Sequence, residues 1–209
     1  MDMTQPMTDT SVLLSFLLFC VVMTGTPGPN NAMVLLVGAR VGVWRAMPLV
    51  AGISVGVGLL LAALGLGLGT LLSAIPGFDV ALRVVGAAYI LWLAWKIASS
   101  GPLQVRDDDT APMGFFGGVA FQWVNPKAWA VTISGVATYV PAEHHAQNVL
   151  LAAVILLLVS VPCVGIWAVG GATFRRLLMH PRYALLFNLS MALVLLVATL
   201  LALVQSLVL

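Results

Sequence analysis

The chain has 209 residues, of which 61% are hydrophobic and 8% are charged, and its formal net charge is +2. A soluble domain of this length cannot bury so much apolar surface, so the composition predicts an all-α integral membrane protein embedded in the lipid bilayer. The few cations do not form a basic patch, and we expect no nucleic-acid partner.

Long apolar runs recur along the whole chain. Each is long enough to cross about 30 Å of hydrocarbon as a helix. We therefore predict six transmembrane helices within a single transmembrane domain over residues 1–209. The runs cover residues 12–39, 46–72, 80–98, 113–138, 148–171 and 184–209.

The spans do not carry the side chains of a catalytic or metal site. An intramembrane hydrolase needs a nucleophile with a base, or two facing carboxylates, and neither arrangement occurs in the spans. Transport of a divalent metal needs clustered oxygen, sulfur or imidazole ligands. We therefore predict that the chain is not an enzyme and that it has no catalytic residue, metal site or cofactor.

The basic residues predict the orientation of the spans. Seven of the nine Lys and Arg side chains follow the first, third and fifth runs, whereas the loops on the opposite side hold only Arg83. By the positive-inside rule the richer loops face the cytoplasm, so both termini lie outside. The seven are Arg40, Arg45, Lys96, Arg106, Arg175, Arg176 and Arg182.

The first apolar run contains the sequence TGTPGPNN. Pro27 and Pro29 remove backbone hydrogen bonds that lipid cannot replace, so this break must line protein or a cavity. Gly28 allows a ligand to approach closely. Asn30 or Asn31 can cap the restarted half-helix, whose free N–H groups and positive dipole end favour a carboxylate. The alternative is a proline kink that only shapes packing.

The fourth run contains a second break, in FQWVNPKAWA. Pro126 interrupts the helix and disfavours helical geometry at Asn125. An ammonium inside a span is costly, so Lys127 is expected to face a cavity and to bind an anion. No span carries a carboxylate near its middle, so we expect the partner to come from outside the chain. We hypothesise that a substrate carboxylate binds Lys127 and the half-helix that starts at Asn30, while Asn125 binds the substrate amine.

The two breaks open the two halves of the chain. With three spans in each half, the second half must cross the membrane in the opposite sense, which makes an inverted repeat. Broken helices at corresponding positions of such repeats indicate the binding site of a transporter. We predict repeat one over residues 11–98, a cytoplasmic linker over 99–112 and repeat two over 113–209. A non-transporting membrane subunit, or a transporter of another small anionic or zwitterionic metabolite, remains an alternative.

Motifs along most of the chain also point to a family. The sequences TPGPN, GLGLGTLL, GAAYILWLAWK and NPKAW, with an FN-containing start to the last span, resemble the LysE/RhtB amino-acid exporters. The resemblance implies a bacterial inner-membrane protein that expels amino acids or close derivatives by proton antiport. Whether the protein forms a homo-oligomer is left open. The family motifs place substrate binding at Pro27, Gly28, Pro29, Asn30, Asn125, Pro126 and Lys127, and we add the neighbouring Asn31 to the predicted site.

The chain departs from the family at one position, and this departure narrows the range of expected substrates. The lysine and arginine exporters carry an aspartate early in the second span, where this chain reads AGISVGVGLL. A cationic side chain would find no counter-ion there. We therefore expect neutral substrates, namely threonine, homoserine, serine-derived or aliphatic amino acids. The same lack of a deep acid leaves the proton-coupling residue unassigned.

Overall fold

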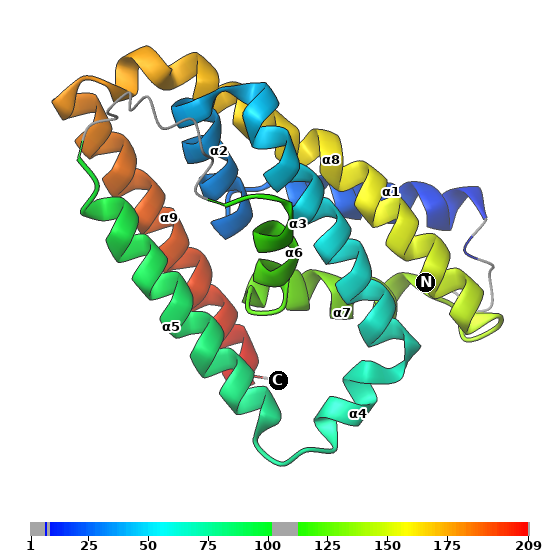
Figure 1. Ribbon diagram of the computed structural model, residues 1–209. Helices are drawn as coiled ribbons and strands as arrows, with labels where there is room; N and C mark the ends of the chain where they lie inside the picture. Colours follow the sequence, from blue (N-terminus) through cyan, green and yellow to red (C-terminus); the bar gives the residue numbers. More distant parts are fainter. Residues whose placement is uncertain (1–6, 8, 102–112, 209) are drawn as a thin grey trace.

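The computed structural model describes residues 7, 9–101 and 113–208, and each regular element in these residues is helical (Figure 1). The prediction of an all-α fold is therefore confirmed. Most of the predicted linker, with Arg106, lies outside the described residues. The elements are α1 (Thr10–Gly25), α2 (Pro29–Val41), α3 (Val43–Ala63), the π-helical turn η1 (Leu64–Leu68), α4 (Gly69–Ser73), α5 (Phe78–Ala98), α6 (Phe115–Gln122), α7 (Pro126–Tyr139), α8 (His145–Leu178) and α9 (Pro181–Val208).

The described residues contain two continuous stretches of helix that are long and apolar enough to cross a membrane. They are Val43–Leu72, with 30 residues, and His145–Leu178, with 34 residues. The bent pair of α1 and α2 makes a third candidate span, and Val84–Ala98 and Pro181–Val197 are shorter apolar helices. The count of six spans therefore stays a prediction, although the helices follow the six apolar runs closely.

Both predicted helix breaks are confirmed. The axes of α1 and α2 differ by 57° across the break between Gly25 and Pro29. The helices α6 and α7 are separate elements that meet at a sharp turn (Figure 1). In each case the second helix starts at a proline, Pro29 or Pro126, which suits the first helical position because it lacks only an amide that would be unpaired there.

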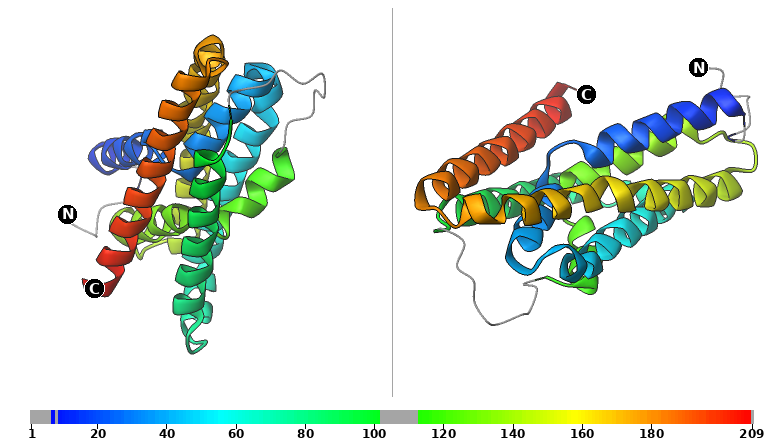
Figure 2. Two further views of the ribbon diagram at one scale, coloured as in Figure 1. Left: turned by 90° about the vertical axis from the view of Figure 1, so that its left-hand side faces the viewer. Right: turned by 90° about the horizontal axis from the view of Figure 1, so that it is seen from above.

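The packing of the helices follows one pattern in both halves of the chain. In the first half, α3 packs on α6 and α7, which form the broken helix of the second half. In the second half, α8 packs on α1 and α2 in the same way. The remaining pair, α5 and α9, lie side by side (Figure 2). Each half of the chain thus packs one of its helices on the broken helix of the other half.

Glycines allow the broken helices to approach their partners at backbone distance. A Cβ atom on Gly52 would collide with the Phe115 carbonyl oxygen, and one on Gly56 would lie 2.8 Å from Val119 Cα. Glycines of the second apolar run thus allow close packing where α3 meets α6. Gly38 and Gly171 make the matching contact between α2 and α8. Such small residues provide tight van der Waals packing, on which helix association in lipid depends.

Two adjacent glycines of α8 test this contact. Gly171→Ala should destabilise the protein by about 1–3 kcal/mol, because the added methyl group would overlap the Leu35 carbonyl and lie 2.9 Å from the Ala39 amide nitrogen. Gly170→Ala is the matched control, because a Cβ atom there meets nothing within 4 Å. Thermal unfolding in detergent measures both changes. Equal melting temperatures for the two variants would contradict close packing of α2 on α8.

Candidate functional site

The first break leaves backbone carbonyls at the end of α1 without helical partners. A helix end has four such groups, and hydrocarbon offers them no hydrogen bonds. Here side chains supply the donors. The Asn31 amide nitrogen donates to the carbonyl oxygens of Thr24 at 2.8 Å and Thr26 at 2.7 Å, and the Trp167 indole donates to Gly25 O at 3.2 Å. Side chains from α2 and α8 therefore satisfy three of the carbonyls at this break.

Lys127 provides the other donors to this break. Its ammonium nitrogen donates to Thr26 O at 3.0 Å, to Thr26 Oγ1 at 2.8 Å and to Pro27 O at 3.2 Å. An ammonium has three hydrogens, and a cation at a helix C-terminus is also favoured by the helix dipole. The expectation that its partner must come from outside the chain is thus wrong in part. The described chain supplies neutral oxygens, and none of these three acceptors carries a negative charge.

Gly28 gives the lysine room to reach the break. A Cβ atom on Gly28 would lie 3.0 Å from Lys127 Cδ and 3.2 Å from Lys127 Nζ. The close approach predicted at this glycine is therefore made by the lysine of the second break. A larger residue would push the ammonium away from the start of α2.

The N-terminus of α2 has no side-chain cap. Gly28 occupies the cap position, and α2 begins at Pro29, so Asn30 and Asn31 lie inside the first turn. The expectation that either asparagine caps this helix is wrong, because capping needs a side chain that precedes the first turn. Gly28, Asn30 and Asn31 line a cavity there, and the uncapped helix start next to Lys127 makes this end of the cavity electropositive.

Asn30 instead forms a reciprocal amide pair with Gln122 at the end of α6. Asn30 Nδ2 donates to Gln122 Oε1 at 2.9 Å, and Gln122 Nε2 donates to Asn30 Oδ1 at 3.0 Å. Gln122 is completely buried and also donates to Gly118 O at 3.0 Å. This pair joins the two breaks directly, 92 residues apart in the sequence.

The second break is capped by its own asparagine. Asn125 Oδ1 accepts a hydrogen bond from the Lys127 backbone N–H at 3.1 Å, which makes Asn125 the N-cap of α7. The side-chain oxygen is therefore engaged in the helix start, which weakens its predicted role as acceptor for a substrate amine. Gly86 of α5 covers the same break, because a Cβ atom there would lie 3.0 Å from Val124 O.

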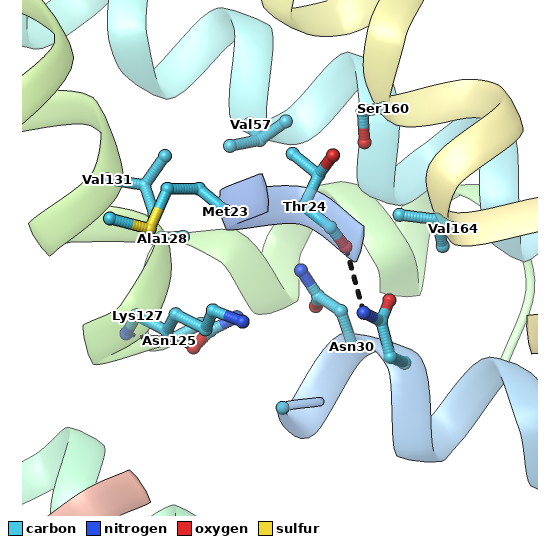
Figure 3. Close-up of a pocket in the computed structure, with 12 residues that line it drawn as sticks. Met23, Thr24, Asn30, Val57, Asn125, Lys127, Ala128, Val131, Ser160 and Val164 are labelled. Carbon is cyan, nitrogen blue, oxygen red and sulfur yellow. Dashed lines mark hydrogen bonds between the residues drawn. The ribbon is translucent and has the colours of Figure 1, made fainter. Parts of the chain in front are cut away.

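The two breaks share one partly open cavity, which has about 30 Å³ of space accessible to water-sized molecules. Figure 3 shows Lys127 and Asn125 on one side, Asn30 across from them, and Val57 and Ser160 along the opposite wall. Within the described chain, Lys127 is the only titratable residue of the lining. The lining comprises Met23, Thr24, Gly28, Asn30, Asn31, Val57, Asn125, Lys127, Ala128, Val131, Ser160 and Val164.

Five of the eight residues predicted to bind substrate line this cavity: Gly28, Asn30, Asn31, Asn125 and Lys127. The three prolines, Pro27, Pro29 and Pro126, shape the breaks around it.

Sequence reasoning missed several polar residues of the site. Gln122 precedes the second break by three residues, and its polar side chain inside an apolar run was a usable signal. Ser160 is also polar within a span, and its hydroxyl bonds that of Ser54 at 3.2 Å, with both residues buried. Trp167 had no such signal, because an indole within a span usually reads as apolar bulk.

Comparison with known proteins identifies the family. The family described as "LysE type translocator" matches residues 21–206. The chain belongs to the LysE family of translocators. The earlier resemblance is thus confirmed, and the LysE-family chain is a transporter and not an enzyme. Membership, together with the apolar helices, places it in the inner membrane as a multi-pass protein.

Several curated relatives carry the name "Cysteine/O-acetylserine efflux protein". The one from Klebsiella pneumoniae subsp. pneumoniae is 36% identical over 173 residues, which cover 80% of this chain and 85% of the relative. The one from Salmonella choleraesuis is 35% identical over 189 residues, covering 89% and 95%. The one from Escherichia coli O157:H7 is 32% identical over 188 residues, covering 88% and 94%. No solved structure matches the chain significantly.

The amide pair between the two breaks can be tested by a double-mutant cycle. Asn30→Leu and Gln122→Leu should each cost about 1–3 kcal/mol, because each removes both hydrogen bonds of the pair and leaves polar atoms of the other amide without this partner. The double variant should cost less than the sum of the two, with a coupling of about 0.6–1.7 kcal/mol, as for polar pairs between membrane helices. Unfolding in mixed detergent micelles measures the cycle. Additive effects would mean that the two amides do not stabilise each other.

Proposed function

We propose that this LysE-family protein is a secondary active exporter of small neutral amino acids, with cysteine and O-acetylserine as the first candidates. The observation that carries the proposal is the cavity between the two helix breaks, which has one cationic group and no acidic residue in its described lining. A pocket of this composition suits a molecule with a carboxylate and an uncharged side chain.

The carboxylate is proposed to bind where α2 starts. The backbone N–H groups of the first turn and the positive end of the helix dipole favour an anion, and the Lys127 ammonium lies beside Gly28 at the same place. Binding would draw the ammonium away from the neutral oxygens of Thr26 and Pro27, since an ionic partner forms the stronger hydrogen bond. Substrate would then loosen one of the contacts that join the two repeats.

The side-chain end of the cavity supports a neutral substrate. Val57, Val131 and Val164 provide apolar contacts, and the Ser160 hydroxyl provides a polar one. A lysine or arginine substrate would place a second cation in a cavity that already holds Lys127. The names of the relatives shift our expectation within the neutral class, from threonine and homoserine to cysteine and the serine-derived O-acetylserine.

Transport would follow from rocking of two inverted three-helix repeats around this site, coupled to proton antiport. Lys127 is the titratable group that the described cavity offers for coupling. A transporter for another small anionic or zwitterionic metabolite is the alternative, and family membership argues against a non-transporting subunit.

Export from proteoliposomes tests this function. Vesicles loaded with labelled cysteine, O-acetylserine, threonine, homoserine, leucine or lysine should release the small neutral amino acids, faster when the receiving side is acidic, and should retain lysine. Lys127→Met should reduce release at least tenfold, because it deletes the charge and keeps the length of the side chain, and Lys127→Arg should restore only part of it. If vesicles that contain the wild-type protein release every amino acid no faster than vesicles without protein, the proposal is contradicted.

The orientation is tested separately by cysteine labelling in intact cells. We expect a cysteine at position 105 to be protected from impermeant reagent and one at position 209 to react, because the positive-inside rule places the central loop in the cytoplasm. Single cysteines can be placed after Cys20 and Cys163 are replaced, since both cysteines are free thiols. Protection at position 209 would contradict the six-span topology and, with it, the inverted repeat.

A further inference from the structure

Asn31 is an asparagine of the first turn of α2 that is only 2% exposed. Its side-chain nitrogen uses both of its hydrogens on the carbonyl oxygens of Thr24 and Thr26, at 2.8 and 2.7 Å. Turning the amide over would set its oxygen against two carbonyl oxygens, so the bonding network fixes its orientation. The position of the side-chain oxygen is therefore determined by the break itself.

That oxygen, Asn31 Oδ1, has no hydrogen-bond partner. Within the described residues it is the one buried side-chain polar atom in this condition. Leaving a buried acceptor unpaired is costly, and such groups in folded proteins usually serve a ligand or a function. Asn31 also lines the cavity that contains Lys127 and the start of α2.

A carbonyl oxygen can accept hydrogen bonds and cannot donate them. It therefore suits an ammonium and does not suit a carboxylate. Three asparagines line the cavity, and two of their side-chain oxygens are engaged: Asn125 Oδ1 caps α7, and Asn30 Oδ1 accepts from Gln122. The asparagine oxygen that remains for a cationic hydrogen-bond donor is on Asn31.

We propose that Asn31 Oδ1 accepts a hydrogen bond from the α-ammonium of the substrate, and so selects α-amino acids over carboxylic acids that lack an amine. This inference rests on the proposed function, since it assigns the amine subsite of the same cavity. In this arrangement Lys127 and the start of α2 bind the carboxylate, and Asn31 binds the amine. Asn31 therefore replaces Asn125 as the residue proposed to bind the substrate amine.

The test compares cysteine with 3-mercaptopropionate, which has the same carboxylate and thiol but no amine. Equilibrium binding to the purified protein in detergent gives both affinities. Wild type should bind cysteine at least about tenfold more tightly, since a hydrogen bond to a charged group is worth that factor or more. In Asn31→Leu and Asn31→Ser the ratio should fall toward one, through loss of cysteine affinity alone.

Asn188→Leu is the matched control. Asn188 is buried, and its side chain donates to Ser100 O at 2.8 Å, but it does not line the cavity. This variant should keep the wild-type ratio. The Asn31 variants are scored only if they elute as folded protein, and Asn31→Ser adds no apolar bulk to the break.

Two results would overturn the inference. The first is equally tight binding of 3-mercaptopropionate and cysteine by the wild type. This measurement does not depend on the folding of any variant. The other is an equal loss of both affinities in the Asn31 variants, which would give Asn31 a packing role only. Neither result contradicts the proposed function if the wild type exports amino acids. If the wild type neither binds nor exports any amino acid, the proposed function itself is wrong.

Discussion

The structure depends on how the backbone carbonyls freed by the TPGP break are satisfied. Each unpaired group in hydrocarbon costs several kcal/mol, so a broken helix inside a membrane persists only where other groups replace the lost bonds. Asn31 and Lys127 supply those bonds from the helices that start after the two breaks, and Trp167 supplies one from α8. The break is therefore stable only while the two halves of the chain remain together.

This requirement connects the fold to transport. The Lys127 ammonium and the Asn30–Gln122 pair both join the two halves of the chain at the cavity. A substrate that competed for the ammonium, as we propose, would act on a contact between these halves, which is how a ligand can bias a two-state equilibrium. The glycine contacts of α2 with α8 and of α3 with α6 also join the two halves of the chain. In the proposed mechanism, substrate binding is linked to conformational change through the hydrogen bonds of Lys127.

Much of this could be predicted from the sequence, because membrane insertion imposes strong rules. The lengths of the apolar runs predicted the helices, and the prolines at positions 27, 29 and 126 predicted both breaks. Local pattern could not show that Lys127 would bond neutral carbonyls 100 residues away, since those oxygens exist only because the first helix stops. The capping expectation at Asn30 and Asn31 failed for a similar reason: tertiary partners, Gln122 and the end of α1, claimed both side chains.

The central claim is that the cavity between the two breaks is the amino-acid site. A structure of the protein crystallised with Se-methylselenocysteine, a neutral amino acid, tests it most directly, because the anomalous signal of selenium locates the ligand independently of the protein phases. We predict a selenium peak between Val57, Val131 and Ser160, with the ligand carboxylate at the start of α2. A peak outside this cavity, under conditions in which the same compound inhibits export, would contradict the account.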